Sequence, residues 1–205
     1  METEPTNSHD SIYPVMSLPG SCLLPTGVLP LYIFEERFQK MLEEALSGDR
    51  MFCIGTRVSG EDTPLRFSSL GLIRACVTRP DGTAHLILHG LRRVEFVEWF
   101  YDQPYDRARV RSIPTEGLNA PEVDDELEEL RSIVREQLLP QVVNSDSLAQ
   151  HLETIEDPES YADTIACNFV SEMEDLQVLL GEPRLGRRLG HLRHMLSALL
   201  ENSQA

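Results

Sequence analysis

The sequence predicts an α+β fold, in which an antiparallel β-barrel with an inserted helix precedes a bundle of α-helices. The first half contains short segments rich in β-branched and aromatic residues, which favour strands. The second half repeats apolar residues every three or four positions, the period of an amphipathic helix. The charge also changes, because residues 1–114 carry 12 basic and 15 acidic side chains, whereas residues 115–205 carry 6 and 19. A domain boundary is therefore expected near residues 114–121.

Short strands at close spacing predict the barrel, which we assign to residues 13–114. The expected strands are 51–58, 71–79, 83–89, 92–99 and 105–113. The segment RPDGT joins the second of them to the third, and its proline, aspartate and glycine are the residues that tight turns require. Closure of the sheet would leave no exposed strand edges, so we expect a closed or nearly closed antiparallel barrel.

A helix interrupts these strands within the stretch LPLYIFEERFQKMLEEALSGDRMFCI, residues 29–54. Glu35 and Glu36 suit the positive N-terminal end of a helix, and Gly48 suits the position after its C-terminus. We expect a helix over 35–46 that joins a strand near 29–34 to the strand at 51–58. The apolar residues of this segment share one helical face: Phe38, Met41, Leu42, Ala45 and Leu46.

Three amphipathic helices are expected in the second half, and they imply a small bundle over residues 120–203. The first covers 121–138, from a proline that the first turn tolerates to the break at Pro140. The second follows Asp157-Pro158 and ends at Gly181-Glu182-Pro183, and the third covers about 184–200. The acidic, polar residues 1–12 are expected to form a disordered tail.

The sequence argues against the commonest catalytic machinery. Lys40 is the only lysine, and no glycine-rich loop precedes it, so a phosphate-binding P-loop is excluded. The nucleophile motif GxSxG and the zinc-protease motif HExxH are also missing. These absences argue against those kinds of ATPase and hydrolase site.

The pattern of cysteines and histidines predicts neither a cofactor nor a metal. Cys22, Cys53, Cys76 and Cys167 form no CxxC pair, so we expect them to be reduced and buried as small hydrophobic residues. The histidine pairs 85/89 and 191/194 could each share one face of an element. Neither pair has a carboxylate or cysteine at ligand spacing, which makes metal binding the weaker alternative.

The net charge of −16 argues against a nucleic-acid partner, which requires clustered positive charge. No apolar run is long enough to cross a membrane, and the N-terminus resembles no targeting segment. We expect a cytoplasmic protein without a membrane partner. The strip Arg107, Arg109 and Arg111 and the acids of residues 122–129 are interpreted as solvated faces, with mutual contact between them as the alternative.

Three stretches together resemble the N-terminal domain of Lon proteases. LPLYIFEERFQKMLEEALSGDRMFCIG resembles that family's LPL-x-IFE-x-R-x-x-x-M segment, and SLGLIRACVTRPDGTAHLILHGLRRVEF is similar to its G-x-I, PDG and L-x-G-x-R succession. DPESYADTIACNFVSEMEDLQVLLGEPRLGRRLGHLRHML is similar to its helical part. In order along the chain, these stretches cover about residues 13–200. Glu36 departs from the pattern, because many relatives have proline there.

The resemblance implies a barrel of the pseudouridine-synthase-and-archaeosine-transglycosylase (PUA-like) type followed by a helical bundle. It further implies a free-standing, non-catalytic module that recognises unfolded or extended segments of other proteins, with a separate protease or ATPase as a further partner. The junction of barrel and bundle is the expected binding surface. Our candidate peptide-binding residues are Leu29, Leu31, Phe34, Arg37, Arg92 and Arg93. For Leu31 and Phe34, a place in the barrel core is the favoured alternative.

A small-molecule ligand in a barrel pocket is the second hypothesis. The cereblon branch of the family holds cyclic imides in this way, with the help of an added zinc domain and a tryptophan cage. This sequence has neither, since Trp99 is its only tryptophan and its cysteines are unpaired. RNA binding, suggested by the name of the barrel type, conflicts with the negative charge.

Overall fold

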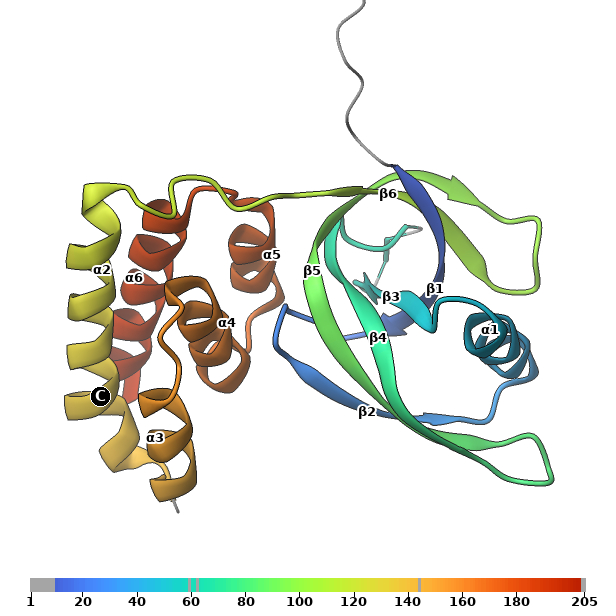
Figure 1. The fold of residues 1–205 in the computed structure, drawn as a ribbon, viewed down its shortest axis with the longest axis horizontal. Helices are drawn as coiled ribbons and strands as arrows, with labels where there is room; N and C mark the ends of the chain where they lie inside the picture. Colours follow the sequence, from blue (N-terminus) through green and yellow to red (C-terminus); the bar gives the residue numbers. More distant parts are fainter. Residues whose placement is uncertain (1–9, 59, 62, 144, 204–205) are drawn as a thin grey trace, which may run out of the picture. The chain divides into compact units, whose positions relative to one another are not determined.

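The computed structural model describes residues 10–58, 60–61, 63–143 and 145–203 (Figure 1). The chain divides between Ile113 and Pro114 into two compact units, which we call the barrel unit and the helical unit. The described residues form six strands and six α-helices, so the predicted α+β fold class is confirmed.

The strands of the barrel unit form one sheet in the order β2-β5-β4-β3-β1-β6, and a further pairing of β5 with β6 closes it. Four of the strand pairs on this closed path are antiparallel, but β1 and β3 run parallel, which corrects the expectation of a purely antiparallel barrel. The strands are β1 (Ser11–Pro19), β2 (Val28–Ile33), β3 (Met51–Arg57), β4 (Phe67–Thr78), β5 (Ala84–Phe100) and β6 (Asp106–Ser112), and the described residues of this unit form one α-helix, α1 (Glu36–Ser47).

Strand β5 replaces the two strands predicted at 83–89 and 92–99. Its first part pairs with β2 and its last part with β6, while β4 accompanies both parts on the other side. Gly90 lies between these two parts. A residue without a side chain is needed there because the backbone at Leu24 passes close to it. A Cβ atom on Gly90 would lie 1.9 Å from the Leu24 carbonyl oxygen, and the Gly90 N–H donates to the Gly27 carbonyl oxygen at 2.9 Å. This glycine therefore marks a close backbone approach and not the end of a strand.

Strand β1 was not among the predicted strands. It contains Pro14 and Pro19, and proline within a run normally argues against a strand. Its partners are distant in sequence, since it pairs with β6 up to Val15 and with β3 from Val15 onward. Of the tail expected at residues 1–12, Ser11 and Ile12 belong to β1, and residues 1–9 lie outside the described residues.

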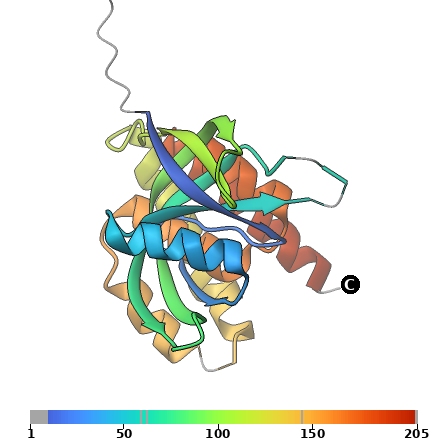
Figure 2. The same ribbon diagram turned by 90° about the vertical axis from the view of Figure 1, so that its right-hand side faces the viewer.

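Helix α1 lies across the strands on one side of the barrel (Figure 2). Its predicted apolar face is confirmed, because Phe38, Met41, Leu42 and Ala45 are all buried. These side chains join a core cluster that also contains Ile33 of β2. A second core cluster is formed by strand residues alone: Val15, Cys53, Leu70, Val94, Phe96, Ala108 and Val110.

The helical unit differs from the prediction in three places. The first helix loses its α-helical geometry after Ile133 and continues as a π-helical turn, in which the Leu139 N–H donates to the Val134 carbonyl oxygen. The second predicted helix is broken at residues 170–172, and a helix at 146–153 was not predicted. The elements are α2 (Pro121–Ile133), η1 (Val134–Leu138), η2 (Leu139–Gln141), α3 (Asp146–Glu153), α4 (Pro158–Phe169), α5 (Met173–Gly181) and α6 (Leu185–Ser203).

The core of the helical unit is aliphatic. Helix α6 packs against α2, α4 and α5, and Leu189 and Leu192 on it are fully buried.

Within the described part of the chain, no helix combines the length and the apolar character that crossing a membrane requires.

Candidate functional site

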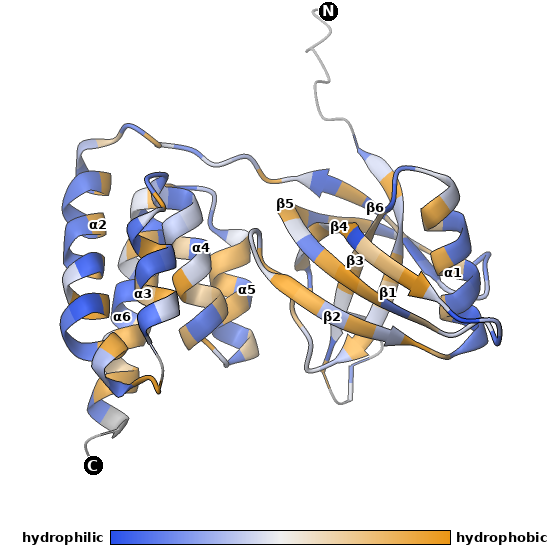
Figure 3. Cartoon of the chain, turned by 60° about the horizontal axis from the view of Figure 1, so that its bottom comes forward, coloured by the Kyte–Doolittle hydropathy of each residue, from blue (hydrophilic) through white to orange (hydrophobic). Residues whose placement is uncertain are grey.

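Strand β2 is the edge strand of the barrel unit and is apolar on both of its faces. Within the described residues it pairs with β5 alone. Because strand side chains alternate between faces, Leu29 and Leu31 pack against the core cluster of α1, whereas Val28 and Tyr32 point outward. Val28 is 61% exposed, Tyr32 48%, and Phe34 just beyond the strand 60%. Figure 3 shows the apolar character of this strand.

The outward side chains of β2 continue across the neighbouring strands. Tyr32 lies opposite His85 of β5, which lies opposite Val77 of β4, so the three stand in one row. The rings of Tyr32 and His85 are stacked at 4.7 Å between centroids, and those of Tyr32 and Phe34 at 5.7 Å. Val77 is 67% exposed. We call this surface the β2 face, and its residues are Val28, Pro30, Tyr32, Phe34, Ala75, Val77, His85 and Ile87.

The β2 face has the properties of a contact surface for protein. It includes most of the lining of a hollow of about 400 Å³, and none of its eight residues is an acid, a lysine or an arginine. Large contiguous apolar patches are uncommon on the surface of monomeric proteins, and they mark interaction sites. The free edge of β2 adds unpaired backbone groups beside the patch, although Pro30 removes one donor.

Arg37, one of the predicted residues, lies near this face at the start of α1. Its guanidinium lies 4.3 Å from the centre of the Phe38 ring, and its Nε donates to Glu35 Oε2 at 2.8 Å. The side chain is 46% exposed. The Arg37 side chain therefore contacts residues at the start of its own helix, and about half of it remains exposed to solvent.

The structure does not bring Arg92 and Arg93 to the β2 face. Both lie beyond Gly90, on the part of β5 that β2 does not reach. Arg93 is only 2% exposed, and Arg92 Nε donates to Ser112 Oγ at 3.2 Å. Arg93 is thus buried in the barrel unit and Arg92 is exposed on it, and both lie outside the contact surface described here.

Of the eight residues of this face, only Phe34 was among the predicted site residues, and the row of Tyr32, His85 and Val77 was not predicted. A signal for Tyr32 was present in the sequence, because LPLYIF is apolar at both alternating positions, and only one set can face the core. Phe34 was expected in the barrel core by the favoured alternative, and its exposure shows that this alternative is wrong. Leu31 does pack against the core, as that alternative expected.

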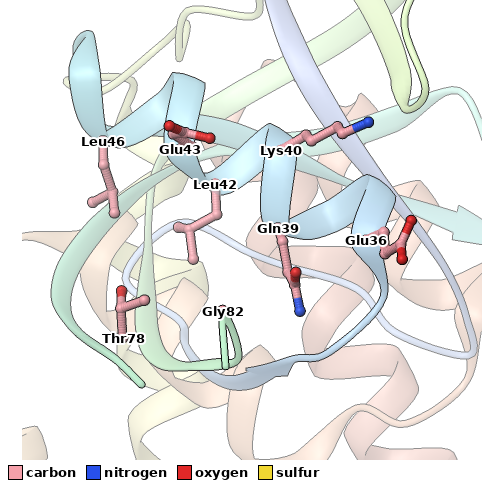
Figure 4. A pocket seen from close by; sticks show the side chains of 8 residues that line it. All are labelled: Glu36, Gln39, Lys40, Leu42, Glu43, Leu46, Thr78 and Gly82. Atoms are coloured by element: carbon pink, nitrogen blue, oxygen red, sulfur yellow. The ribbon is translucent and has the colours of Figure 1, made fainter. Parts of the chain in front are cut away.

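A second hollow of the barrel unit, of about 550 Å³, lies between α1 and the β4–β5 hairpin (Figure 4). Leu42 and Gln39 point from α1 toward the loop that carries Gly82, whereas Lys40 points away from it. The lining residues are Glu36, Gln39, Lys40, Leu42, Glu43, Leu46, Thr78 and Gly82. None of these eight residues is aromatic.

The four cysteines differ in their surroundings. Burial raises the pKa of the Cys53 thiol to about 12 and that of Cys22 to about 11, so both stay protonated at neutral pH. Cys167 is exposed, and the expectation that all four are buried is wrong for this residue. Within the described ranges, no three histidine, cysteine, aspartate or glutamate residues lie close enough together to hold a metal ion.

The arginine strip of β6 makes its ion pairs within the barrel unit. The pairs are Arg107 with Asp102, Arg109 with Glu98, and Arg111 with Asp10 and Glu95.

Comparison with known proteins gives one consistent result. The family model described as the ATP-dependent protease La (LON) substrate-binding domain matches residues 12–198. The Lon protease of Dictyoglomus thermophilum is 25% identical over 207 residues, which cover 98% of this chain and 26% of that protein. The Lon protease of Trichlorobacter lovleyi is 29% identical over 198 residues, 91% of this chain and 24% of its own length. The chain thus spans about a quarter of these relatives.

Solved structures show the same fold. The N-terminal domain of a Mycobacterium avium complex Lon protease superposes with a TM-score of 0.68 at 16% identity, over 91% of this chain and 98% of that one. A Lon N-terminal domain protein from Xanthomonas campestris gives 0.66 at 19% identity, over 89% and 96%. Both cover nearly the whole chain, across the strands and the helices.

Proposed function

Because the chain belongs to the ATP-dependent protease La (Lon) substrate-binding domain family, we propose that it is a non-catalytic protein-binding module. Its ligands are unfolded or extended segments of cytoplasmic proteins, held on the β2 face. Transfer of the bound segment to a separate protease or ATPase is the finer form of this proposal, and the match to the substrate-binding domain of that protease family supports it.

The exposure of Tyr32, Phe34 and Val77 carries the proposal. These side chains are 48%, 60% and 67% exposed, although each is large and apolar. Burying such a patch against a partner is favourable by about 25 cal/mol per Å² of apolar surface. An extended segment suits this place, because it can contact the row across β2, β5 and β4 and also reach the free edge of β2.

Binding to a permanently unfolded protein tests the proposal. We expect immobilised chain to bind reduced, carboxymethylated α-lactalbumin and not the native form of that protein. The double variant Tyr32→Ser/Val77→Ser should bind at least about fivefold more weakly, because truncation of central aromatic and aliphatic anchors removes most interface energy. Val97→Ser, which changes a valine that is 41% exposed on another part of β5, is the matched control.

Two results would count against the proposal. One is that the unfolded protein does not bind at all, and the other is that the double variant binds it as tightly as the unchanged chain. Urea unfolding of each variant shows whether a loss of binding comes from a loss of folded protein.

The small-molecule hypothesis receives less support. It would use the hollow between α1 and the β4–β5 hairpin, but a flat, base-like or imide ligand needs an aromatic wall for stacking. None of the lining residues that the structure describes there is aromatic.

A further inference from the structure

The helical unit contains a hollow of its own, of about 410 Å³. That volume falls in the range of about 300–1,000 Å³ typical of small-ligand pockets. Its walls come from the end of α2, the π-helical turn η1, α3 and the start of α4. Apolar groups line most of it: Val134, Leu139, Ala149, Leu152, Ile155 and the ring of Tyr161. Arg131, Arg135, Glu153 and Glu156 supply its charged groups.

Arg131 is unusual among the arginines of this unit because it lines an apolar wall without a carboxylate partner among the described residues. Its guanidinium lies 5.1 Å from the centre of the Tyr161 ring, and its Nη2 is 3.5 Å from the Ile155 carbonyl oxygen, the limit for a hydrogen bond. In contrast, Arg188 and Arg193 each have a glutamate oxygen at 2.9 Å.

The absence of a carboxylate partner for Arg131 in the described part of the chain is notable because residues 115–205 are strongly acidic. Residues 115–205 contain 19 acidic and only 6 basic side chains, and Arg184, Arg188 and Arg193 each have a glutamate oxygen within 3.3 Å. Arg135, the second cation of the hollow, has only a long contact of 3.9 Å to Glu136, with both side chains more than 60% exposed. Such exposed pairs contribute little. The hollow therefore offers two guanidinium groups beside apolar walls; Glu153 and Glu156 line it as well, but neither of them forms an ion pair with Arg131.

We propose that this hollow binds the C-terminal residue of a polypeptide when that residue has an apolar side chain. The side chain would occupy the space between Ala149, Leu152 and Tyr161, and the terminal carboxylate would accept hydrogen bonds from Arg131. Guanidinium–carboxylate pairs are strong and directional, and they strengthen where water is partly excluded. Glu153 and Glu156 disfavour a ligand that is only anionic, so the preferred peptide has a basic residue before its last one.

Calorimetric titration of the full chain with an acetylated peptide, Gly-Ser-Gly-Ser-Arg-Leu, tests this proposal. We expect saturable binding of the free acid and at least about tenfold weaker binding of the C-terminal amide, because the amide lacks the charge that Arg131 recognises. The variant Arg131→Gln should weaken binding of the free acid by a similar factor. Arg187→Gln is the matched control, since Arg187 is an exposed arginine of the same unit that does not line the hollow.

A second variant, Ala149→Phe, fills the hollow without removing any charge and should also abolish binding. The Tyr32→Ser/Val77→Ser variant should bind this peptide normally, which separates the proposal from that for the β2 face. The proposal is overturned if the free acid does not bind, if acid and amide bind equally, or if either hollow variant binds like the unchanged chain while still folded. Free leucine binding as tightly as the peptide would overturn the assignment to a chain terminus.

Discussion

The phenol of Tyr105 donates a hydrogen bond to the carboxylate of Glu44, which ties the residue preceding β6 to helix α1. Tyr105 is 3% exposed and belongs to the core cluster that α1 completes. The bond therefore holds the last turns of the inserted helix against the barrel.

Replacement of Tyr105 by Phe should lower the free energy of unfolding by about 1–2 kcal/mol, because a hydrogen bond to a carboxylate is lost. Burial, followed by the bond to Glu44, raises the pKa of the Tyr105 phenol to about 12. In the unfolded chain it is about 10, so the protonated phenol stabilises the fold fully below pH 10. That stabilisation is lost as the pH rises toward 12. Urea unfolding at several pH values should show the free energies of unfolding of the two proteins converging as the pH rises toward 12. A difference that stays constant with pH would contradict this.

Arg188 should be essential to the helical unit. Its side chain is 1% exposed, and its Nη2 donates to Glu159 Oε1 at 2.9 Å and to Thr115 Oγ1 at 3.3 Å. Removal of one partner from a buried ion pair typically costs about 3–5 kcal/mol, so we expect Arg188→Ala to destabilise this unit by about 3 kcal/mol. Arg187→Ala, at the exposed neighbouring position, should change stability by less than about 0.5 kcal/mol. Circular dichroism during urea unfolding measures both, and equal effects would refute the assignment.

Replacement by alanine should lower the stability of the protein at Gly90 and raise it at Gly190. At Gly90 the new Cβ meets the Leu24 carbonyl oxygen at 1.9 Å, a backbone atom that cannot move without shifting the loop. We expect a loss of more than about 2 kcal/mol. At Gly190, inside α6, the nearest atoms are side-chain oxygens of Glu126 at 3.6 Å. Alanine there should stabilise the chain by about 0.5–1 kcal/mol. Thermal unfolding distinguishes the two outcomes, and a neutral Gly90→Ala would be inconsistent with the crossing of the chain at this point.

The alternation of β2 predicts that stability and binding respond to different side chains. Leu31→Ala should cost about 1–2 kcal/mol because this half-buried residue packs against the core cluster. Val77→Ala, at a site that is 67% exposed, should change stability by less than about 0.5 kcal/mol, while it weakens binding of the unfolded protein. Denaturation and binding curves of the two variants test this prediction. If Leu31→Ala weakened binding and Val77→Ala lowered stability, the contact surface would lie on the other face of β2.

Thiol labelling should report burial directly. Cys167 is exposed, whereas Cys53 is fully buried and burial raises its thiol pKa to about 12. Because the thiolate is the reactive species, a maleimide or disulfide reagent at pH 7–8 should modify Cys167 first and leave Cys53 unmodified until urea unfolds the chain. Mass spectrometry of digested samples identifies the labelled position, and Cys167→Ser should remove the fast phase. Rapid labelling of Cys53 in the native state would contradict the packing around it.

Local patterns in the sequence predicted several elements well. The face of α1 formed by Phe38, Met41, Leu42 and Ala45 is one example, because its period of 3.6 residues does not depend on any partner. The PDG turn of the β4–β5 hairpin is another, since Gly82 has a φ of +84° that glycine adopts readily. Of the residues of the β2 face, Phe34 was named from the sequence, whereas Tyr32, Val77 and His85 are brought there by strand pairing across the sheet.

What the sequence by itself determined is the α+β class, the position of the inserted helix and the family, because these follow from periodicity, turn residues and ordered motifs. The tertiary structure decided the rest through contacts between distant segments. Strand β1, with its two prolines, exists because β3 and β6 hold it. Gly90 is part of one long strand because Leu24 crosses there. Val28 and Tyr32 of β2 face solvent because the alternate residues, Leu29 and Leu31, are the ones that pack against the core cluster of α1. Partners far apart along the chain leave no local pattern, so these features could be found only in the folded molecule.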